Sequence, residues 1–289
     1  MKLLVTHHSP DLDAIGSCWM LKRFDAETYA DAKIDFVNPG ETIDLRTAAD
    51  LGFAREDITH VDTGLGPFDH HQPERGLQRV CATTLAYDYV CTLHPELAKD
   101  EALFFLADYV NTIDHFEEVF WDKADDMKYQ LLLQNLIEGV RLSGASDDLA
   151  QLNFGFTCLD SAYAVLTQQV EAYHELEQKG RPFKSPWGKA LAIESKNDET
   201  IKLAQKQGFI VVVRKNAEHG NVRIKAIPGK QIDLTPLYEQ IKREDTIGTW
   251  YFHPSKTMLL NGSSKSKVDV PSPLSLDRIV DMIKDLNKE

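Results

Sequence analysis

Short apolar segments alternate with helical patterns over the first 142 residues of this chain. Residues 2–6, 33–38 and 58–62 predict strands. Helical spacing of apolar residues predicts helices over residues 14–24, 43–51, 82–93, 100–119 and 124–142. This alternation predicts an α/β fold, with a mainly parallel sheet flanked by helices. In such sheets ligands bind beyond the carboxyl ends of the strands.

The pattern changes after residue 180. Residues 159–178 carry one apolar stripe at helical spacing, Gly180 can cap that helix, and Pro182 stops its continuation. Residues 180–188 then read as a linker or domain edge. Further strands are predicted over residues 189–193, 209–214, 221–227, 249–252 and 258–260, and Ser275 can cap a last helix. We therefore expect a first domain over 1–180 and a smaller α+β domain over 181–289.

Charge is divided unevenly between these two parts. Residues 1–180 hold 13 Lys and Arg against 32 Asp and Glu, whereas residues 181–289 hold 19 against 13. An acidic unit repels phosphate unless cations intervene, and a basic unit attracts it. The division therefore favours two units with different tasks, although a difference in solvated surface explains the charges equally well.

Several classes of protein are excluded by composition. The chain has 289 residues, of which 43% are hydrophobic, and none of its apolar runs approaches the ~20 residues needed to span a bilayer. The apolar run at the N-terminus is too short for a secretion signal. The four cysteines form no CxxC pair, so we expect reduced thiols in a cytoplasmic protein that does not act at a membrane.

The first polar motif lies at the turn from the first predicted strand into the first predicted helix. It contains His7, Asp11 and Asp13. One imidazole and two carboxylates on a short turn can converge on divalent cations. Gly16 and Ser17 begin a helix whose N-terminal amides favour an anion such as phosphate. The alternative is that Asp11 or Asp13 only caps the helix.

Three further polar motifs follow along the chain. Asp62 ends the third predicted strand, Asp69-His70-His71 follows it, and Asp114 lies in a helical stretch. Each has an ordinary reading when taken alone: a turn residue, a surface loop or core histidine, and a solvated helix acid. Their joint occurrence in this order makes a common site the stronger hypothesis.

The ordered set His–Asp–Asp, Asp, Asp-His-His and Asp resembles that of the DHH phosphoesterase superfamily. Residues 221–228, 252–255 and 261–262 make the chain similar to the melanocyte-proliferating-gene exonuclease family in particular. The resemblance implies a DHH-like α/β catalytic domain over 1–180. It also implies a hydrolase acting on ester bonds, a phosphoesterase with 3′–5′ exonuclease-like activity.

The resemblance also implies roles for individual residues. It assigns six side chains to two Mn²⁺ ions, with Mg²⁺ as a substitute: His7 and Asp11 to one ion, Asp13, His70 and Asp114 to the other, and Asp62 to both. His71 would contact the scissile phosphate and act as an acid, and Asp69 would orient the histidines. The flanking His8, His60 and His115 are expected to support the site rather than to bind metal.

The basic second domain is expected to hold the part of the substrate that does not react. Its candidate residues are Arg214, Arg223, Lys225, His253, Lys256 and Lys265. The expected substrate is a short single-stranded RNA or DNA, or a nucleotide. A manganese-dependent inorganic pyrophosphatase and an inactive metal-binding interaction protein are the alternatives. The oligomeric state stays open, with a homodimer as one option.

Overall fold

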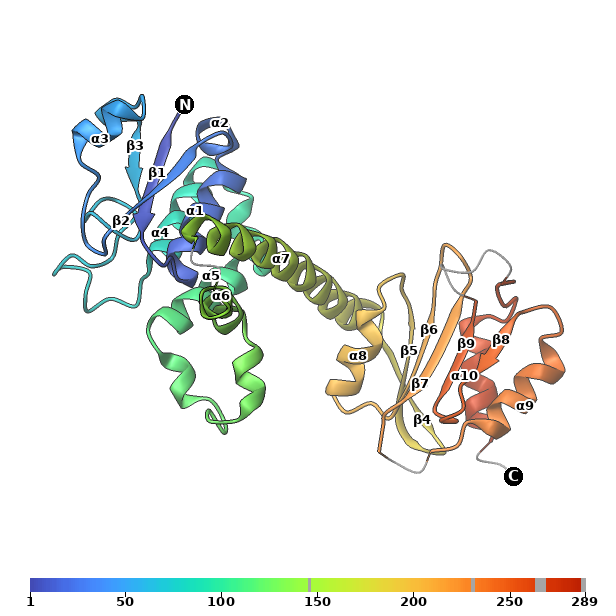
Figure 1. Cartoon of the computed structure of the whole chain (residues 1–289). Coiled ribbons are helices and arrows are strands. Elements are labelled where there is room, and N and C mark those ends of the chain that lie inside the picture. The colour runs from blue at the N-terminus through green and yellow to red at the C-terminus, as the bar shows by residue number, and fades with distance from the viewer. Residues whose placement is uncertain (145–146, 230–231, 263–268, 287–289) are drawn as a thin grey trace. The chain divides into compact units, whose positions relative to one another are not determined.

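The computed structural model describes residues 1–144, 147–229, 232–262 and 269–286. The chain divides into two compact units, Met1–Thr167 and Gln168–Glu289. The division falls inside helix α7 (Asp148–Lys179), which runs through both units (Figure 1). The boundary expected from the sequence lies at Gly180, directly after the end of this helix. We call Met1–Thr167 unit 1 and Gln168–Glu289 unit 2.

Unit 1 contains the predicted parallel sheet. Its strands are β1 (Leu3–His7), β2 (Lys33–Val37) and β3 (Ile58–His60), in the order β2-β1-β3. Both pairings are parallel, so the three carboxyl ends lie at one edge. The mainly parallel α/β architecture is thereby confirmed.

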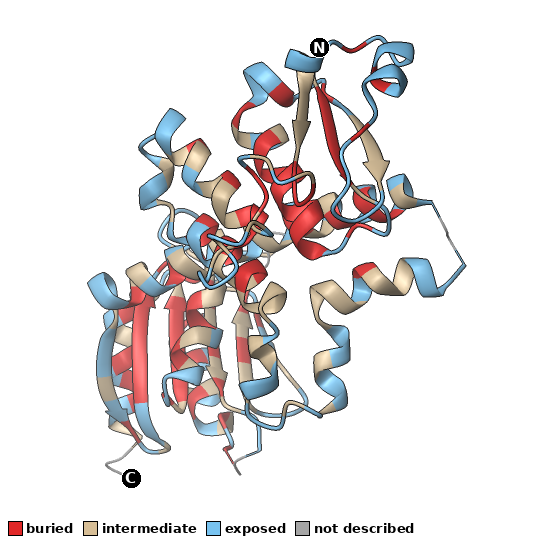
Figure 2. Ribbon diagram, turned by 90° about the vertical axis from the view of Figure 1, so that its left-hand side faces the viewer, coloured by how far each residue is buried: buried red, intermediate tan, exposed pale blue. Residues whose placement is uncertain are grey.

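Helices cover both faces of this sheet. On one face, Leu4 packs in a core with residues of α1 (Leu12–Phe24), α4 (Ala82–Leu93) and α5 (Glu101–Asp114). On the other, Leu3 and Val5 pack against Ala48 of α3 (Leu45–Asp50). Ten consecutive residues of α1 are buried, as the red ribbon of Figure 2 illustrates. Helix α1 is therefore enclosed by its neighbours and holds its N-terminal residues firmly.

Two glycines allow helices to approach α1 closely. A Cβ on Gly16 would lie 2.5 Å from Thr83 Oγ1 of α4, and a Cβ on Gly155 of α7 would lie 2.7 Å from Ile15. Either distance is too short for a real contact. Gly16 thus brings the first turn of α4 next to the first motif.

The helical part of unit 1 corrects three expectations. The helix expected over residues 100–119 ends at Asp114, and Phe116 has φ 54° before the 3-10 turn Glu117–Phe120. The helix expected over residues 124–142 is α6 (Leu133–Leu142), which a second 3-10 turn, Met127–Leu131, precedes. The helix expected from residue 159 begins at Asp148. A short helix, α2 (Ala26–Tyr29), was not expected.

Unit 2 is the expected smaller α+β domain. Its six strands, in the order β4-β5-β6-β7-β9-β8, pair antiparallel except for β5 with β6. They are β4 (Arg181–Ser185), β5 (Gly188–Glu194), β6 (Val211–Lys215), β7 (Val222–Ala226), β8 (Trp250–Phe252) and β9 (Met258–Asn261). Of the two readings of residues 180–188, a linker or a domain edge, the linker is wrong, because β4 pairs with β5 along its length.

The helices of unit 2 pack on both faces of its sheet. Residues of α9 (Thr235–Glu244) and α10 (Leu276–Asp285) share a core with Val213 and Ile224. On the opposite face α8 (Glu199–Lys206) covers Val212 near one end of the sheet. The sequence analysis did not predict α8 and α9, whereas α10 begins after Ser275 as predicted. Among the described helices of the chain, none is long and apolar enough to cross a membrane.

Candidate metal centre

Asp11 and Asp13 lie where β1 leads into α1. Asp11 is the N-cap of α1, and its Oδ1 accepts from the backbone N–H groups of Asp13 and Ala14, each at 3.0 Å. Asp13 is buried, and its two oxygens accept at 2.7 Å from the N–H groups of Ala82 and Thr83. These amides belong to the first turn of α4, whose close approach Gly16 permits. Asp11 therefore caps α1, whereas Asp13 accepts its hydrogen bonds from the first turn of α4.

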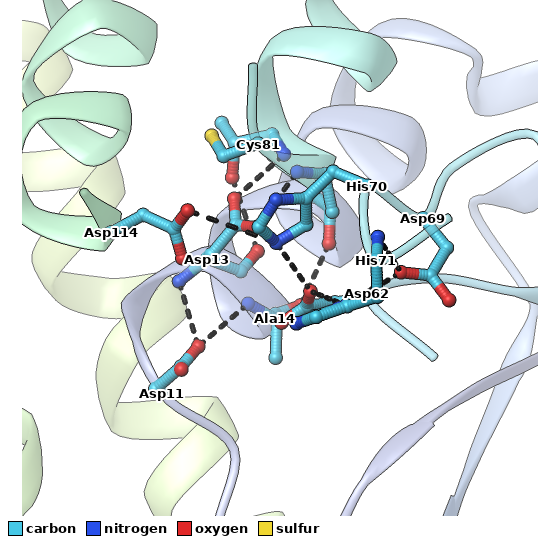
Figure 3. Close-up of polar contacts among 12 residues, drawn as sticks. Asp11, Asp13, Ala14, Asp62, Asp69, His70, His71, Cys81 and Asp114 are labelled. Carbon is cyan, nitrogen blue, oxygen red and sulfur yellow. Dashed lines mark hydrogen bonds and ion pairs between the residues drawn. The ribbon is translucent and has the colours of Figure 1, made fainter. Parts of the chain in front are cut away.

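Asp62 lies between two histidines from different parts of the chain. Its Oδ2 is 3.2 Å from His7 Nε2 at the end of β1, and its Oδ1 is 3.4 Å from His70 Nε2. The same His70 nitrogen lies 3.7 Å from both Asp13 Oδ2 and Asp114 Oδ2. Figure 3 shows His70 among these three carboxylates. Asp62 has φ 53°, a strained backbone conformation of the kind found at functional sites.

The loop that carries His70 and His71 is organised by Asp69. This buried carboxylate accepts from the N–H of Leu65 through Oδ2, at 2.7 Å, and from the N–H of His71 through Oδ1, at 3.1 Å. The same Oδ1 is 2.7 Å from His71 Nδ1. In this arrangement a protonated Nδ1 donates a hydrogen bond to Asp69, and Nε2 of His71 points away from Asp69. His71 is largely exposed, whereas His70 is not.

Asp114 is the last residue of α5. Arg79, which was not expected from the sequence to support the site, makes several contacts at this helix end. Arg79 donates to Asp108 at 2.8 Å, to Thr112 at 3.0 Å, and to both carboxylate oxygens of Glu117. These contacts tie the segment before α4 to α5 and to the turn that follows it. A lone arginine outside any motif carries no sequence signal of this role.

The pKa values of the clustered carboxylates shift in different directions. Burial opposes ionisation of Asp62, but His7 and His70 lower its pKa, whereas the pKa values of Asp13 and Asp114 are raised. Burial, and then the charges of Asp62 and Asp114, raise the pKa of Asp13 well above its usual range. Burial also raises the pKa of Asp114, to about 6. The pKa of His70 is raised to about 9, above all by Asp62. For His7, burial lowers the pKa, but Asp62, the backbone of His8 and Asp11 together raise it to about 9. The cluster therefore favours added positive charge, which protonation of His7 and His70 supplies in part.

The donor set fits divalent metal ions. Three overlapping groups have ligand atoms within 4.8 Å of one another: His7, Asp11 and Asp62; Asp13, His70 and Asp114; and Asp62, His70 and His71. Asp62 Oδ1 and His70 Nε2 are buried and lack a hydrogen-bond partner among the described residues. Buried polar atoms nearly always have a partner, so these two atoms fit the role of ligands to a bound ion.

The flanking histidines make other contacts. His8 Nδ1 lies 2.6 Å from Asp148 Oδ2 at the start of α7. His60 Nε2 accepts from the N–H of Ile43 at 3.1 Å, which occupies that nitrogen. His115 Nδ1 lies 3.0 Å from the carbonyl of Asn111 and 3.5 Å from Asp114 Oδ2. Asp148 was missed because its partner is 140 residues away.

In unit 2, three of the predicted basic residues lie near one acid. Arg214 and Arg223 face each other across β6 and β7, and both pair with Asp198. Arg214 is buried and also donates to the carbonyl of Ser195 at 2.6 Å. Lys225 follows on the same face of β7, where burial and the charge of Arg223 lower its pKa. Arg223 and Lys225 are therefore the accessible cations of this group, whereas Arg214 has its partners inside the fold.

The remaining predicted basic residues lie in or beyond the β8–β9 turn. His253 Nδ1 lies 2.8 Å from Ser255 Oγ, and Lys256 Nζ lies 3.0 Å from Asp233 Oδ2. Lys265 lies outside the described residues. His253 Nδ1 therefore has a partner within the turn, and Lys256 has one outside it.

Comparison with known proteins adds little. No family model and no curated protein sequence matches the chain. Among solved structures, the pGpG-specific phosphodiesterase PggH from Vibrio cholerae is 13% identical, with a TM-score of 0.31 over 99% of this chain and 98% of that one. RecJ from Thermus thermophilus in complex with Mn²⁺ is 13% identical, with a TM-score of 0.33 over 99% and 52%. A putative family II inorganic pyrophosphatase from Methanococcus jannaschii is 15% identical, with a TM-score of 0.22 over 98% and 99%. These scores are low, so the function is derived from the site itself.

Proposed function

We propose that this chain is a metal-dependent phosphohydrolase that cleaves phosphodiester bonds of short oligonucleotides or nucleotides. The observation that carries the proposal is the convergence of four separate motifs on one buried cluster. His7, Asp13, Asp62, His70 and Asp114 come from different elements, and their ligand atoms lie within 4 Å of a neighbour. Acids that only cap helices have no reason to gather in this way.

Two overlapping ligand sets support two divalent ions. His7, Asp11 and Asp62 would hold one ion, Asp13, His70 and Asp114 the other, and Asp62 would serve both. When bound, such a pair of ions lowers the pKa of a water molecule and neutralises charge on the phosphate oxygens. Imidazole nitrogens among the carboxylates favour a borderline ion such as Mn²⁺ over Mg²⁺, which prefers oxygen ligands.

The chain's own residues supply proton transfer and orientation. Asp69 fixes the ring of His71 through Nδ1, so Nε2 is the atom that would carry a proton to the leaving oxygen. The exposure of His71 suits contact with a substrate better than metal binding. We further propose that the basic residues of unit 2, Arg223 and Lys225 foremost, bind phosphates of the substrate that do not react.

Hydrolysis of bis(p-nitrophenyl) phosphate with Mn²⁺ and with a chelator tests the reaction, and a metal count tests the ligands. The wild-type protein should bind two ions and lose activity with the chelator. His71→Ala should lower turnover by about 10²–10⁴-fold with both ions retained. The matched variant His70→Ala should lose one ion. The same metal loss in both variants would reverse the two assignments.

A substrate panel separates the alternatives. Labelled di- to decanucleotides, cyclic dinucleotides and pyrophosphate should be offered to the Mn²⁺-loaded protein. Cleavage of pyrophosphate alone would identify a pyrophosphatase. Two bound ions with no hydrolysis of any substrate would identify a metal-binding interaction protein, and the proposal would be withdrawn.

A further inference from the structure

A cavity of about 380 Å³ opens beside the candidate metal centre, entirely within unit 1. Part of its lining is the centre itself, including Asp11, Asp13, His70 and Asp114. The rest comes from α1, α5, α6, α7 and the turn after α5. Its volume lies in the range of ~300–1,000 Å³ usual for small-molecule sites. A ligand with one end at the candidate metal centre would therefore extend into this cavity.

Outside the candidate metal centre, the cavity is lined by polar residues, Ser9, Gln134, Glu138 and Gln151, and by a larger apolar part. The apolar part includes Leu12, Val110, Ile113, Phe116 and Ile137. Phe116 lines this cavity and is 72% exposed. The free side of its ring is available to a ligand.

The backbone holds Phe116 in a strained position. Its φ of 54° is left-handed, a conformation that costs a bulky residue ~1–3 kcal/mol and persists only where neighbours enforce it. The N–H of Phe116 donates to the carbonyl of Ile113 at 3.0 Å, and Arg79 anchors the next residue, Glu117. Strain of this kind at the wall of a cavity indicates that the ring is positioned for a contact.

Polar groups at the same cavity are oriented by the protein. Gln134 accepts from the hydroxyl of Tyr109 at 2.7 Å through Oε1, so its amino group remains available as a donor. Gln151 donates from Nε2 to the carbonyl of Pro10 at 3.0 Å, so its oxygen remains as an acceptor. The cavity thus offers a flat apolar surface together with a fixed donor and a fixed acceptor.

We propose that this cavity binds the nucleobase adjacent to the scissile phosphate, with Phe116 stacking on the base and Gln134 contacting its edge. The inference rests on the proposed phosphodiesterase function and specifies its substrate as a nucleotide. Inorganic pyrophosphate has no apolar part to place against Phe116 and Ile113. An aliphatic group would leave the two oriented amides unused, whereas a base has both a π-face and a hydrogen-bonding edge.

The test compares a 5′-phosphorylated dinucleotide with two analogues. One analogue lacks the 5′ base and the other lacks the 3′ base. Wild-type protein should prefer the full dinucleotide over one of these abasic analogues by about 10–100-fold in kcat/KM, the range expected for base stacking. Phe116→Ala should remove most of this preference, and Phe116→Tyr should restore it. Phe120→Ala is the matched control, because Phe120 lies in the same turn, is 86% exposed and does not line the cavity. It should keep the preference.

Calorimetric titration of the Mn²⁺-loaded protein with adenosine and uridine monophosphates and with ribose 5-phosphate gives a second readout. At least one nucleotide should bind about tenfold more tightly than the sugar phosphate, and Phe116→Ala should abolish the difference. Equal affinity for nucleotides and sugar phosphate, or an unchanged substrate preference in Phe116→Ala, would overturn the base site while leaving hydrolysis intact. Base-dependent binding without any hydrolysis would instead overturn the proposed function and keep the base site.

Discussion

Two buried aspartates, Asp245 of unit 2 and Asp13 of unit 1, differ in what surrounds their charge. Asp245 of unit 2 accepts from Trp250 Nε1 at 2.6 Å, from Ser272 Oγ at 2.5 Å and from the N–H of Gly248 at 2.6 Å. Although burial opposes ionisation, these donors lower its pKa. Asp13 of unit 1 is equally buried, yet its pKa is raised by burial and by the charges of Asp62 and Asp114.

The contrast separates a carboxylate satisfied by the fold from one that we propose as a metal ligand. Around Asp245, neutral donors satisfy the charge, which stabilises the surrounding loop and strands. In unit 1, like charges gather and Asp62 Oδ1 has no hydrogen-bond partner among the residues described. Such an arrangement destabilises the metal-free chain and is reasonable only where cations enter.

The largest stability effect should come from removing the satisfied carboxylate. Asp245→Ala leaves Trp250, Ser272 and Gly248 without their acceptor, so we expect unit 2 to lose about 3 kcal/mol of unfolding free energy. Urea denaturation measures this loss. Asp277→Ala, at an exposed aspartate of α10 that pairs with Arg181, should cost less than about 1 kcal/mol. Equal losses in the two variants would mean that the Asp245 network contributes nothing special.

The second prediction concerns the charge difference between the units. Arg223→Ala should lower kcat/KM for a labelled oligonucleotide by about tenfold, ~1.4 kcal/mol, because a phosphate loses a cationic partner. Hydrolysis of bis(p-nitrophenyl) phosphate should change little. Added salt should shrink the difference between wild type and variant.

The control for this variant is Arg181→Ala, which removes an exposed arginine of β4 in the same unit. It should leave oligonucleotide cleavage nearly unchanged. If Arg223→Ala impairs both substrates equally, Arg223 supports the fold or the metal centre, and unit 2 loses its proposed part in substrate binding.

The smallest expected effect is a gain, rather than a loss, in the free energy of unfolding. Asp114→Asn removes one of the crowded carboxylates, so the metal-free protein should gain about 1 kcal/mol of unfolding free energy at pH 7. The folded-state pKa of Asp114 is raised to about 6, so its cost is fully present above pH 6 and absent below its ordinary pKa. The gain should therefore fade as pH falls from 7 toward 4.

Thermal unfolding with and without Mn²⁺ measures this prediction. Manganese should stabilise the wild type more than Asp114→Asn, since the variant has lost an ion ligand. Asp44→Asn, at an exposed N-cap without a side-chain hydrogen bond, is the control and should show no such pH dependence. A metal-free Asp114→Asn protein less stable than wild type at pH 7 would contradict the functional reading of the cluster.

Parts of the fold were predictable because their signals are local. The strands and helices near the first motif follow from apolar spacing, and the α10 cap follows from Ser275, whose side chain accepts from the N–H of Arg278. The helix ends of the α5–α6 region were not predictable. The sequence around Phe116 has helical composition, but the α5 helix stops at Asp114 and Phe116 adopts a left-handed conformation beside the contacts of Arg79. Strand β4 looked like a linker because its pairing with β5 is a tertiary fact.

The sequence by itself predicts a mainly parallel sheet with Asp11, Asp13 and Asp62 at the carboxyl ends of its strands, whereas the strand order that makes β1 and β3 neighbours comes from the structure. The resemblance assigns His7, but apolar spacing does not distinguish it from the adjacent and chemically identical His8, and the tertiary structure shows what each imidazole contacts. His7 lies beside Asp62, whereas His8 contacts Asp148. The same holds for Arg214, whose burial against Ser195 and Asp198 depends on strand register and on α8. Local spacing specifies the type and order of polar groups, while long-range packing specifies which atoms face one another.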